Sequence, residues 1–148
     1  MTMMLILALV TLVLHGALTG LFYTFSMSVI PGLNAIDPAQ AETAMRSINV
    51  KILNPWLYLA FLGSPVAALV TGFLAGSPAA IWFFAAAAVS FVGSFLVTMV
   101  INVPMNNAVN AGTMSWKDYS PRWTAWNTFR AAASAAGLVL VGVGLVNL

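Results

Sequence analysis

Long apolar stretches separated by short polar connections constrain this chain more than any other feature of its sequence. Four such stretches, at about residues 3–30, 54–75, 79–101 and 121–147, are each long enough to cross the roughly 30 Å hydrocarbon core of a bilayer as a helix. Only 5% of the residues are charged, whereas a soluble domain has about a quarter. We therefore expect an all-α integral membrane protein whose four spans form a single-domain four-helix bundle.

The connection between the first two spans, residues 31–53, is the only segment with soluble character. Asp37 precedes Pro38, which is a helix-capping residue followed by a proline in the first helical position. Residues 39–51 can then form a short helix with Ile48 on one side and Asn49 toward the other. We expect an interfacial helix that lies across one end of the bundle, with an ordinary connecting loop as the alternative.

Positive charge is unevenly distributed between the two ends of the predicted bundle. Four cations lie in or beside the connections at residues 31–53 and 102–121, namely Arg46, Lys51, Lys117 and Arg122. The positive-inside rule then places both connections on the cytoplasmic side of the cell membrane and both termini outside. Because the net charge of +2 rests on these boundary positions, we expect membrane lipid as a partner and no nucleic acid.

Few residues could hold a metal or a redox cofactor. The chain has no cysteine, one histidine and three carboxylates, which excludes thiol chemistry and leaves too few ligands for an ordinary metal site. We therefore predict no metal and no cofactor. A haem held by His15 and a methionine is the alternative, although the methionines follow no pattern.

A buried cation is the most informative feature of the fourth span. Trp123, Asn127 and Arg130 are spaced i, i+4 and i+7, which places them on one helical face. A cation inside the membrane costs at least ~2.5–3.5 kcal/mol, so intramembrane arginines are usually functional. Arg130 is predicted to hold an anionic ligand or to offset negative charge that develops in a reaction. The alternative is a side chain that reaches toward the surface and bonds to neutral groups.

A cluster of amides follows the third span. Asn102, Asn106 and Asn107 offer donors and acceptors without charge, which suits the hydroxyl and carbonyl groups of a flat polar aromatic. Pro104 must kink this helix or begin a new one. The alternative role for these amides is to join helices inside the membrane. Trp123 and Trp126 can stack on a ring, or can belong to the aromatic belt at the membrane surface.

A polar stripe runs along the first span and is predicted to face the bundle interior. Its members, at helical spacing, are Thr11, His15, Thr19, Phe22 and Ser26. His15 is the only side chain that ordinarily accepts a proton near neutral pH, so it is either a catalytic base or a hydrogen-bonded packing residue. The predicted pocket combines this stripe with the polar face of the fourth span and the amide cluster.

Several stretches occur together in a characteristic order. They are residues 20–33, 45–49 and 52–56, the sequence Asn-Val-Pro-Met-Asn-Asn at 102–107, and the sequence Trp-Thr-Ala-Trp-Asn-Thr-Phe-Arg at 123–130. In this order they resemble the anthrone oxygenase-like family of small membrane proteins, over most of the chain. The resemblance implies four membrane helices. It also implies the activity associated with fungal members, which is the oxidation of polyketide anthrones to anthraquinones by molecular oxygen without flavin, haem or metal.

The chemistry of such a reaction is compatible with the candidate residues. Arg130 with Asn127 and Asn106 would stabilise an enolate and a peroxide, and His15 or water would be the base. The predicted ligand-binding residues are Asn102, Asn106, Asn107, Trp123, Trp126, Phe22, Ser26 and Asn49. The alternative function is a non-catalytic membrane protein that binds a lipophile or quinone, or serves in transport or assembly. The small residues between 131 and 144 would also allow a homo-oligomer.

Overall fold

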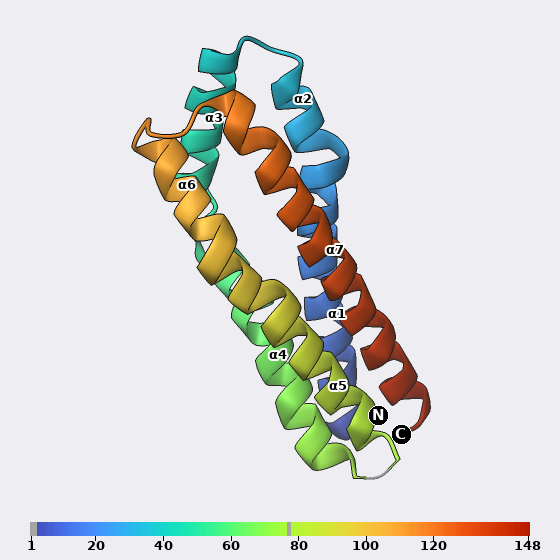
Figure 1. The fold of residues 1–148 in the computed structure, drawn as a ribbon. Helices are drawn as coiled ribbons and strands as arrows, with labels where there is room; N and C mark the ends of the chain where they lie inside the picture. Colours follow the sequence, from blue (N-terminus) through green and yellow to red (C-terminus); the bar gives the residue numbers. More distant parts are fainter. Residues whose placement is uncertain (1–2, 77) are drawn as a thin grey trace.

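The computed structural model describes residues 3–76 and 78–148, and the regular structure within these residues is entirely helical. Four helical rods, Met3–Asn34, Pro55–Ala75, Ala80–Asn110 and Trp116–Val146, are long and apolar enough to cross a membrane. They form an elongated antiparallel bundle with Met3 and the end of the last rod at the same end (Figure 1). The predicted all-α membrane bundle is confirmed.

Two of the four rods are built from several helical segments, and a short helix precedes the second rod. The first comprises α1 (Met3–Thr24), the π-helical turn η1 (Phe25–Val29) and α2 (Ile30–Asn34). The short helix α3 (Pro38–Lys51) precedes α4 (Pro55–Ala75). The third rod comprises α5 (Ala80–Ser90), the π-helical segments η2 (Phe91–Leu96) and η3 (Thr98–Asn102), and α6 (Val103–Asn110). The last rod is the single helix α7 (Trp116–Val146).

Polar side chains lie inside the bundle and apolar side chains lie outside. The hydroxyl groups of Thr11 and Thr71 are 2.9 Å apart, and both residues are fully buried. By contrast, the side chains of Val13 and Phe73 are 68% and 73% exposed. Lipid is as apolar as a leucine side chain, so interhelical hydrogen bonds and close packing hold such helices together. This arrangement confirms that the polar stripe of the first span faces inward.

Two rods continue beyond the predicted ends of their spans, through a proline in each case. The first span was predicted to end near residue 30 and the third near 101, whereas the helices end at Asn34 and Asn110. Pro31 and Pro104 each lie two residues after a π-helical segment, η1 and η3 respectively. A proline lacks the N–H of a regular helix, and its ring clashes with the carbonyl four residues earlier. The wider π turn accommodates the ring, and the helix therefore continues.

The last helix begins at Trp116 rather than near residue 121 as predicted. Ser115 caps it, because its hydroxyl group accepts from the Asp118 N–H at 3.3 Å and donates to the Asp118 carboxylate at 2.8 Å. Pro121 lies inside the helix, close to its start. Its missing N–H affects the carbonyl of Lys117, an exposed residue that water can reach.

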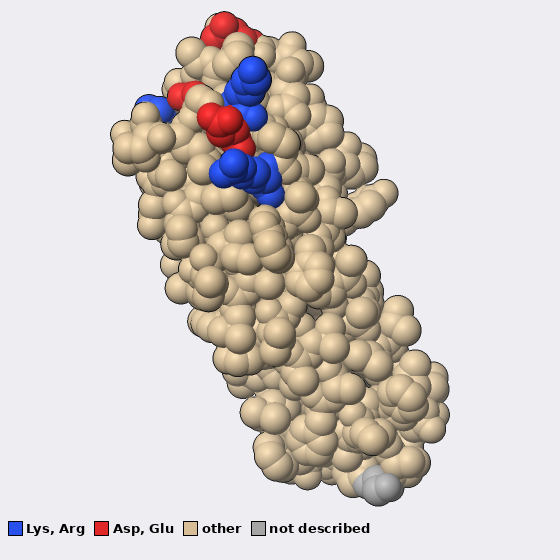
Figure 2. All heavy atoms as spheres, viewed as in Figure 1, with Lys and Arg blue, Asp and Glu red and all other residues tan. Residues whose placement is uncertain are grey.

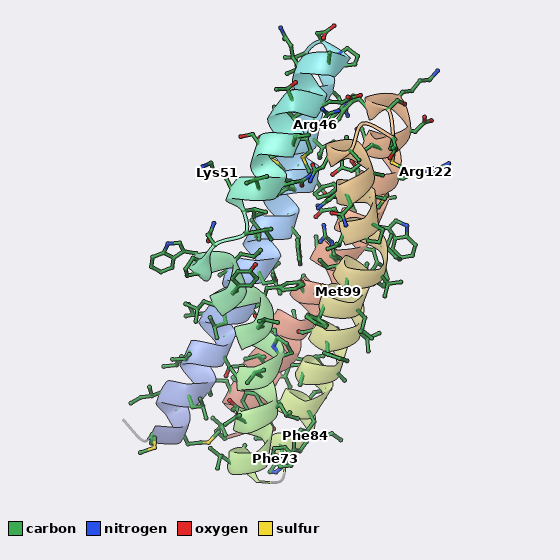
Figure 3. All side chains as sticks on the ribbon, turned by 90° about the vertical axis from the view of Figure 1, so that its left-hand side faces the viewer. Arg46, Lys51, Phe73, Phe84, Met99 and Arg122 are labelled. Atoms are coloured by element: carbon green, nitrogen blue, oxygen red, sulfur yellow. The ribbon has the colours of Figure 1, made fainter. Side chains whose placement is uncertain are left out.

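The short helix α3 forms as predicted, but its orientation and inner face differ from the prediction. It lies in line with α4 and beside α6, rather than across the end of the bundle (Figures 1 and 3). Its buried row is Ala41, Met45 and Asn49, so Asn49 points inward instead of outward. This row packs against α2, α6 and α7. Near the connections, α3 therefore replaces α4 as the fourth helix of the bundle.

The break between α3 and α4 is fixed by Asn54. Its side-chain oxygen accepts from the N–H groups of Trp56 (3.0 Å) and Leu57 (3.2 Å), and its amide donates to the carbonyl of Lys51 (2.9 Å). The replacement Asn54→Ala is therefore expected to destabilise the protein by about 1 kcal/mol, the usual cost of losing a helix cap. Thermal unfolding in detergent measures this, with Asn147→Ala at the opposite end as the control. An unchanged melting temperature for Asn54→Ala would contradict the assignment.

The charged side chains at the surface gather at one end of the molecule. Figure 2 shows them over the end formed by α2, α3, α6 and the start of α7, called here the charged end, while the rest of that face is uncharged. Trp56, Tyr58 and Trp126 are exposed nearby, as expected for side chains at the lipid–water boundary. The cytoplasmic placement of the charged end remains a prediction from the positive-inside rule.

Candidate functional site

A cavity of about 330 Å³ lies where α3 gives way to α4. Its lining comes from all four rods and is mostly apolar: Leu21, Phe22, Phe25, Met45, Ile48, Asn49, Ile52, Leu53, Leu57, Tyr58, Phe61, Thr98, Met99, Val103, Asn106, Asn107, Asn110, Trp123, Asn127 and Arg130. Leu53, Tyr58 and Met99 are exposed members of this lining, so the cavity opens between the α3–α4 break and η3. Figure 3 views the molecule from this side, with Lys51 labelled at the end of α3 and Met99 labelled on η3.

Among the described residues that line the cavity, Arg130 is the only charged one, and it is 4% exposed. Its Nη1 donates to the Thr98 hydroxyl at 2.9 Å, and its Nη2 donates to the Asn127 side-chain oxygen at 2.8 Å. The guanidinium carbon lies 4.3 Å from the Phe22 ring centroid. Among the described residues the one ion pair joins Arg46 to Glu42, so the partners of Arg130 are all neutral. A desolvated cation with neutral partners favours an anion in the cavity.

Asn127 serves to hold Arg130 in place. Its amide nitrogen donates to the Phe22 carbonyl at 2.8 Å and to the Ser26 hydroxyl at 2.7 Å, while its oxygen accepts from Arg130. These bonds use both amide hydrogens. Asn127 therefore acts as a positioning residue between α7 and the first rod, rather than as a donor to a ligand. Ser26 belongs to the same network and lies outside the cavity lining.

Asn106 is oriented by two aromatic donors. Its side-chain oxygen accepts from the Tyr119 hydroxyl and from the Trp123 indole nitrogen, both at 2.8 Å. The opposite amide orientation would place N–H groups against these two donors, so the hydrogen-bond partners fix which atom is oxygen. The Nδ2 group of Asn106 then remains as a donor toward the cavity. Trp123 and Phe25 form one aromatic wall, with ring centroids 5.4 Å apart.

The remaining amides lie at the side of the cavity nearest the charged end. Asn49 donates to the side-chain oxygen of Asn110 at 3.1 Å and thereby joins α3 to α6. Asn107 and Asn110 are exposed members of the lining. The structure therefore brings together seven of the residues predicted from the sequence: Phe22, Asn49, Asn106, Asn107, Trp123, Asn127 and Arg130.

His15 is not part of the cavity lining. It is fully buried, its Nδ1 lies 2.8 Å from the Thr11 carbonyl, and its Nε2 lies 3.0 Å from the Ser90 hydroxyl. A carbonyl accepts but cannot donate, so Nδ1 carries the hydrogen and Nε2 accepts from Ser90. This geometry corresponds to the packing role of the two roles predicted for His15. No group of three or more His, Asp or Glu side chains suited to a metal occurs in residues 3–76 and 78–148.

Trp126 and Asn102 also lie outside the lining. The Trp126 side chain is 40% exposed and packs edge-on against Phe129, as a member of the lipid-facing belt. Asn102 is 1% exposed, and neither its side-chain nitrogen nor its oxygen has a hydrogen-bond partner. Helix spacing predicted which side these residues face, but it did not show which of them reach the cavity.

The unpaired amide of Asn102 leads to a stability prediction. A buried polar group without a partner costs about 1–3 kcal/mol, so Asn102→Leu, of similar shape, is expected to raise the melting temperature in detergent. Asn49→Leu is the matched control and is expected to lower it, because Asn49 does have a partner in Asn110. A lower melting temperature for Asn102→Leu would show that this amide is paired in the folded protein.

Sequence reasoning missed Thr98 and Tyr119. Thr98 bonds to Arg130, and Tyr119 fixes Asn106. Both could have been found by extending a helical pattern by one turn, since Thr98 is four residues before Asn102 and Tyr119 four before Trp123. The aromatic side chains Tyr58 and Phe61 on α4 carried no comparable signal, because residues 55–63 around them include no amide and no charged side chain.

Fold and cavity together define a small four-helix membrane protein with a buried arginine beside a largely apolar cavity that opens between the α3–α4 break and η3. The chain belongs to the anthrone oxygenase family, whose match covers residues 56–140, more than half of its length. This match includes Asn106, Trp123, Asn127 and Arg130. The family assignment made from the sequence is confirmed. Neither the curated proteins nor the solved structures include a match to the chain.

Proposed function

We propose that the chain is a membrane oxygenase that converts an anthrone-type aromatic ketone to the corresponding quinone with molecular oxygen. The observation that carries this proposal is the buried guanidinium of Arg130, whose protein partners are all neutral. The surrounding walls are aromatic and aliphatic, and the volume of about 330 Å³ falls in the usual range of small-molecule sites. Family membership supports the reaction class.

The reaction balances with one molecule of each substrate. Loss of a proton from the carbon opposite the ketone gives an enolate, whose electrons reduce oxygen as a carbon–oxygen bond forms. Protonation of the resulting peroxide gives a hydroperoxide. Loss of the remaining proton on that carbon then breaks the oxygen–oxygen bond, leaving the second carbonyl and water. One anthrone and one oxygen molecule thus yield one quinone and one water.

The cavity residues supply charge stabilisation and orientation for this sequence. The enolate oxygen would lie against the guanidinium of Arg130 and the Nδ2 group of Asn106, since preorganised donors stabilise negative charge as it develops. Phe22 and Trp123 would hold the flat ring system between aromatic faces. Asn127 would keep the guanidinium in position through its bonds to α1 and to Ser26.

Oxygen uptake by the purified protein given a simple anthrone tests the proposal. After correction for autoxidation, we expect one oxygen molecule consumed for each quinone formed. With isotopically heavy oxygen gas, the label should enter the new carbonyl. No uptake above background, combined with a ligand-induced rise in melting temperature, would reject the oxygenase and leave a binding protein.

The second candidate function is a non-catalytic protein that binds a lipophile or quinone. One observation favours it: the described residues that line the cavity include no aspartate, glutamate, histidine or lysine that could accept a proton. Such a protein would use the same cavity without turnover. Oxygen uptake therefore separates the two functions.

A further inference from the structure

We propose that the ligand of this cavity is a membrane-soluble weak acid that binds as its conjugate base and releases its proton to water, not to a side chain. The inference rests on the proposed function, because it assigns the class of ligand that the same cavity takes. It extends that function by naming the proton acceptor and by making the acidity of the ligand a determinant of specificity.

The titratable groups around Arg130 leave no side chain to receive a proton from the ligand. In the first rod, both ring nitrogens of His15 are engaged, and His15 lies seven residues, or about 10 Å along the helix, from Phe22. In α3, Glu42 is bonded to Arg46 and to the backbone N–H of Trp116.

The other elements around the cavity also lack a base. The rod Ala80–Asn110 contains no charged residue and no histidine. In α7, the Tyr119 hydroxyl already donates to Asn106. Tyr58 in α4 and Lys51 at the end of α3 are exposed, whereas the Arg130 guanidinium is buried. Solvent is the remaining proton acceptor.

The opening of the cavity has separate apolar and polar sides. Leu53, Tyr58 and Met99 expose apolar surface near the level of the aromatic belt, which suits access from the bilayer by a neutral, lipid-soluble acid. Asn107 and Asn110 lie on α6 nearer the charged end and are exposed. A proton leaving along this amide side meets water, while the anion stays against Arg130.

This arrangement makes a quantitative prediction about binding. A guanidinium stays protonated over the ordinary pH range, so the ionisation of the ligand is the step that changes with pH. If only the anion binds, the apparent dissociation constant rises about tenfold for each unit by which the pH lies below the pKa of the ligand, and it is constant above that pKa. The pH at which the dissociation constant levels off is then set by the pKa of the ligand and not by a group of the protein.

Proton release on binding tests the inference without any oxidation. The full chain, purified in lipid nanodiscs, is titrated with a hydroxyanthraquinone and with its methyl ether in two buffers of different ionisation enthalpy. Below the ionisation of the hydroxyl group, we expect about one proton released for each hydroxyanthraquinone bound and none for the ether. With a second, less acidic hydroxyanthraquinone, the pH dependence of the dissociation constant should shift. The expected shift equals the difference between the pKa values of the two ligands, measured in the same nanodiscs.

Three substitutions test which side chains are needed for proton release on binding. Arg130→Gln is expected to abolish proton release, whereas Arg122→Gln, an exposed arginine of the same helix, should leave it unchanged. His15→Gln should also leave it unchanged. Tight binding of the hydroxyanthraquinone without proton release would overturn the inference, and so would equal affinity for the methyl ether. Neither result would contradict the oxygenase proposal, which is tested by turnover. Absence of binding by every probe would instead overturn the proposed function of the cavity.

Discussion

Replacing Arg130 by glutamine is expected to lower turnover of an anthrone by about a hundredfold or more. Removing one preorganised donor from a developing oxyanion typically costs 10²–10³ in rate, and here the lost group also carries the only charge in the cavity lining. The loss should appear in kcat/KM, because the guanidinium holds the negative charge of the substrate from binding through to the transition state. Arg130→Lys should retain part of the rate, since lysine keeps the charge but not the planar fork of donors.

The same replacement should leave the fold intact. Glutamine can still donate to a neighbour such as Thr98 or Asn127, and it removes a cation that is unfavourable inside the membrane. Melting temperature measured beside turnover separates a catalytic effect from unfolding, and Arg122→Gln provides the matched control. Wild-type turnover in a folded Arg130→Gln protein would reject the proposed role of Arg130 and with it the mechanism.

Much of the site follows from local periodicity. Trp123, Asn127 and Arg130 face one way because of their spacing in a helix, and the cavity does lie on that side of α7. Phe22 follows from the polar stripe of the first span in the same way. A helix fixes the directions of its side chains from sequence alone, so a polar face within an apolar span predicts an inward surface.

The functions of individual atoms did not follow from periodicity. Asn127 was expected to contact the ligand, yet its amide hydrogens are used by the Phe22 carbonyl and the Ser26 hydroxyl, both more than a hundred residues away in the chain. His15 faces inward as predicted, but the bundle interior is as long as the membrane is thick, and spacing does not give depth. Contacts between helices that are distant in the sequence determine both the hydrogen-bond partners of Asn127 and the depth of His15 in the bundle.

The helix boundaries were missed for a related reason. A proline in an apolar run usually marks an end, but η1 and η3 accommodate Pro31 and Pro104 within continuous rods. In the third rod this continuation matters for the site, because it extends α6 far enough for Asn106 and Asn110 to line the cavity. No residue type marks a π turn reliably, so the sequence alone did not indicate these segments.

Gly93→Leu is expected to prevent recovery of a folded bundle. A Cβ atom added at Gly93 would lie 2.5 Å from the Cβ of Ala133, closer than real Cβ contacts, and 3.9 Å from its Cα. The third rod and α7 therefore approach each other closely at this point, and the hydrogen bond of 2.7 Å between Ser94 and Ser134 depends on that approach. Close backbone packing is a main source of helix association in lipid, so a large side chain here removes it.

Gly93→Ala should be milder, with a loss of about 1–3 kcal/mol, the usual cost of overpacking. Thermal unfolding and gel filtration in detergent measure both variants, and Gly20→Leu is the control because the position of its Cβ atom is open. Ala133 lies three residues from Arg130 on α7, so the spacing set at Gly93 also determines whether Arg130 reaches Thr98. We therefore expect Gly93→Ala to lose more turnover than its stability alone would explain. A Gly93→Leu protein as stable as Gly20→Leu would show that the two rods are farther apart than this packing requires.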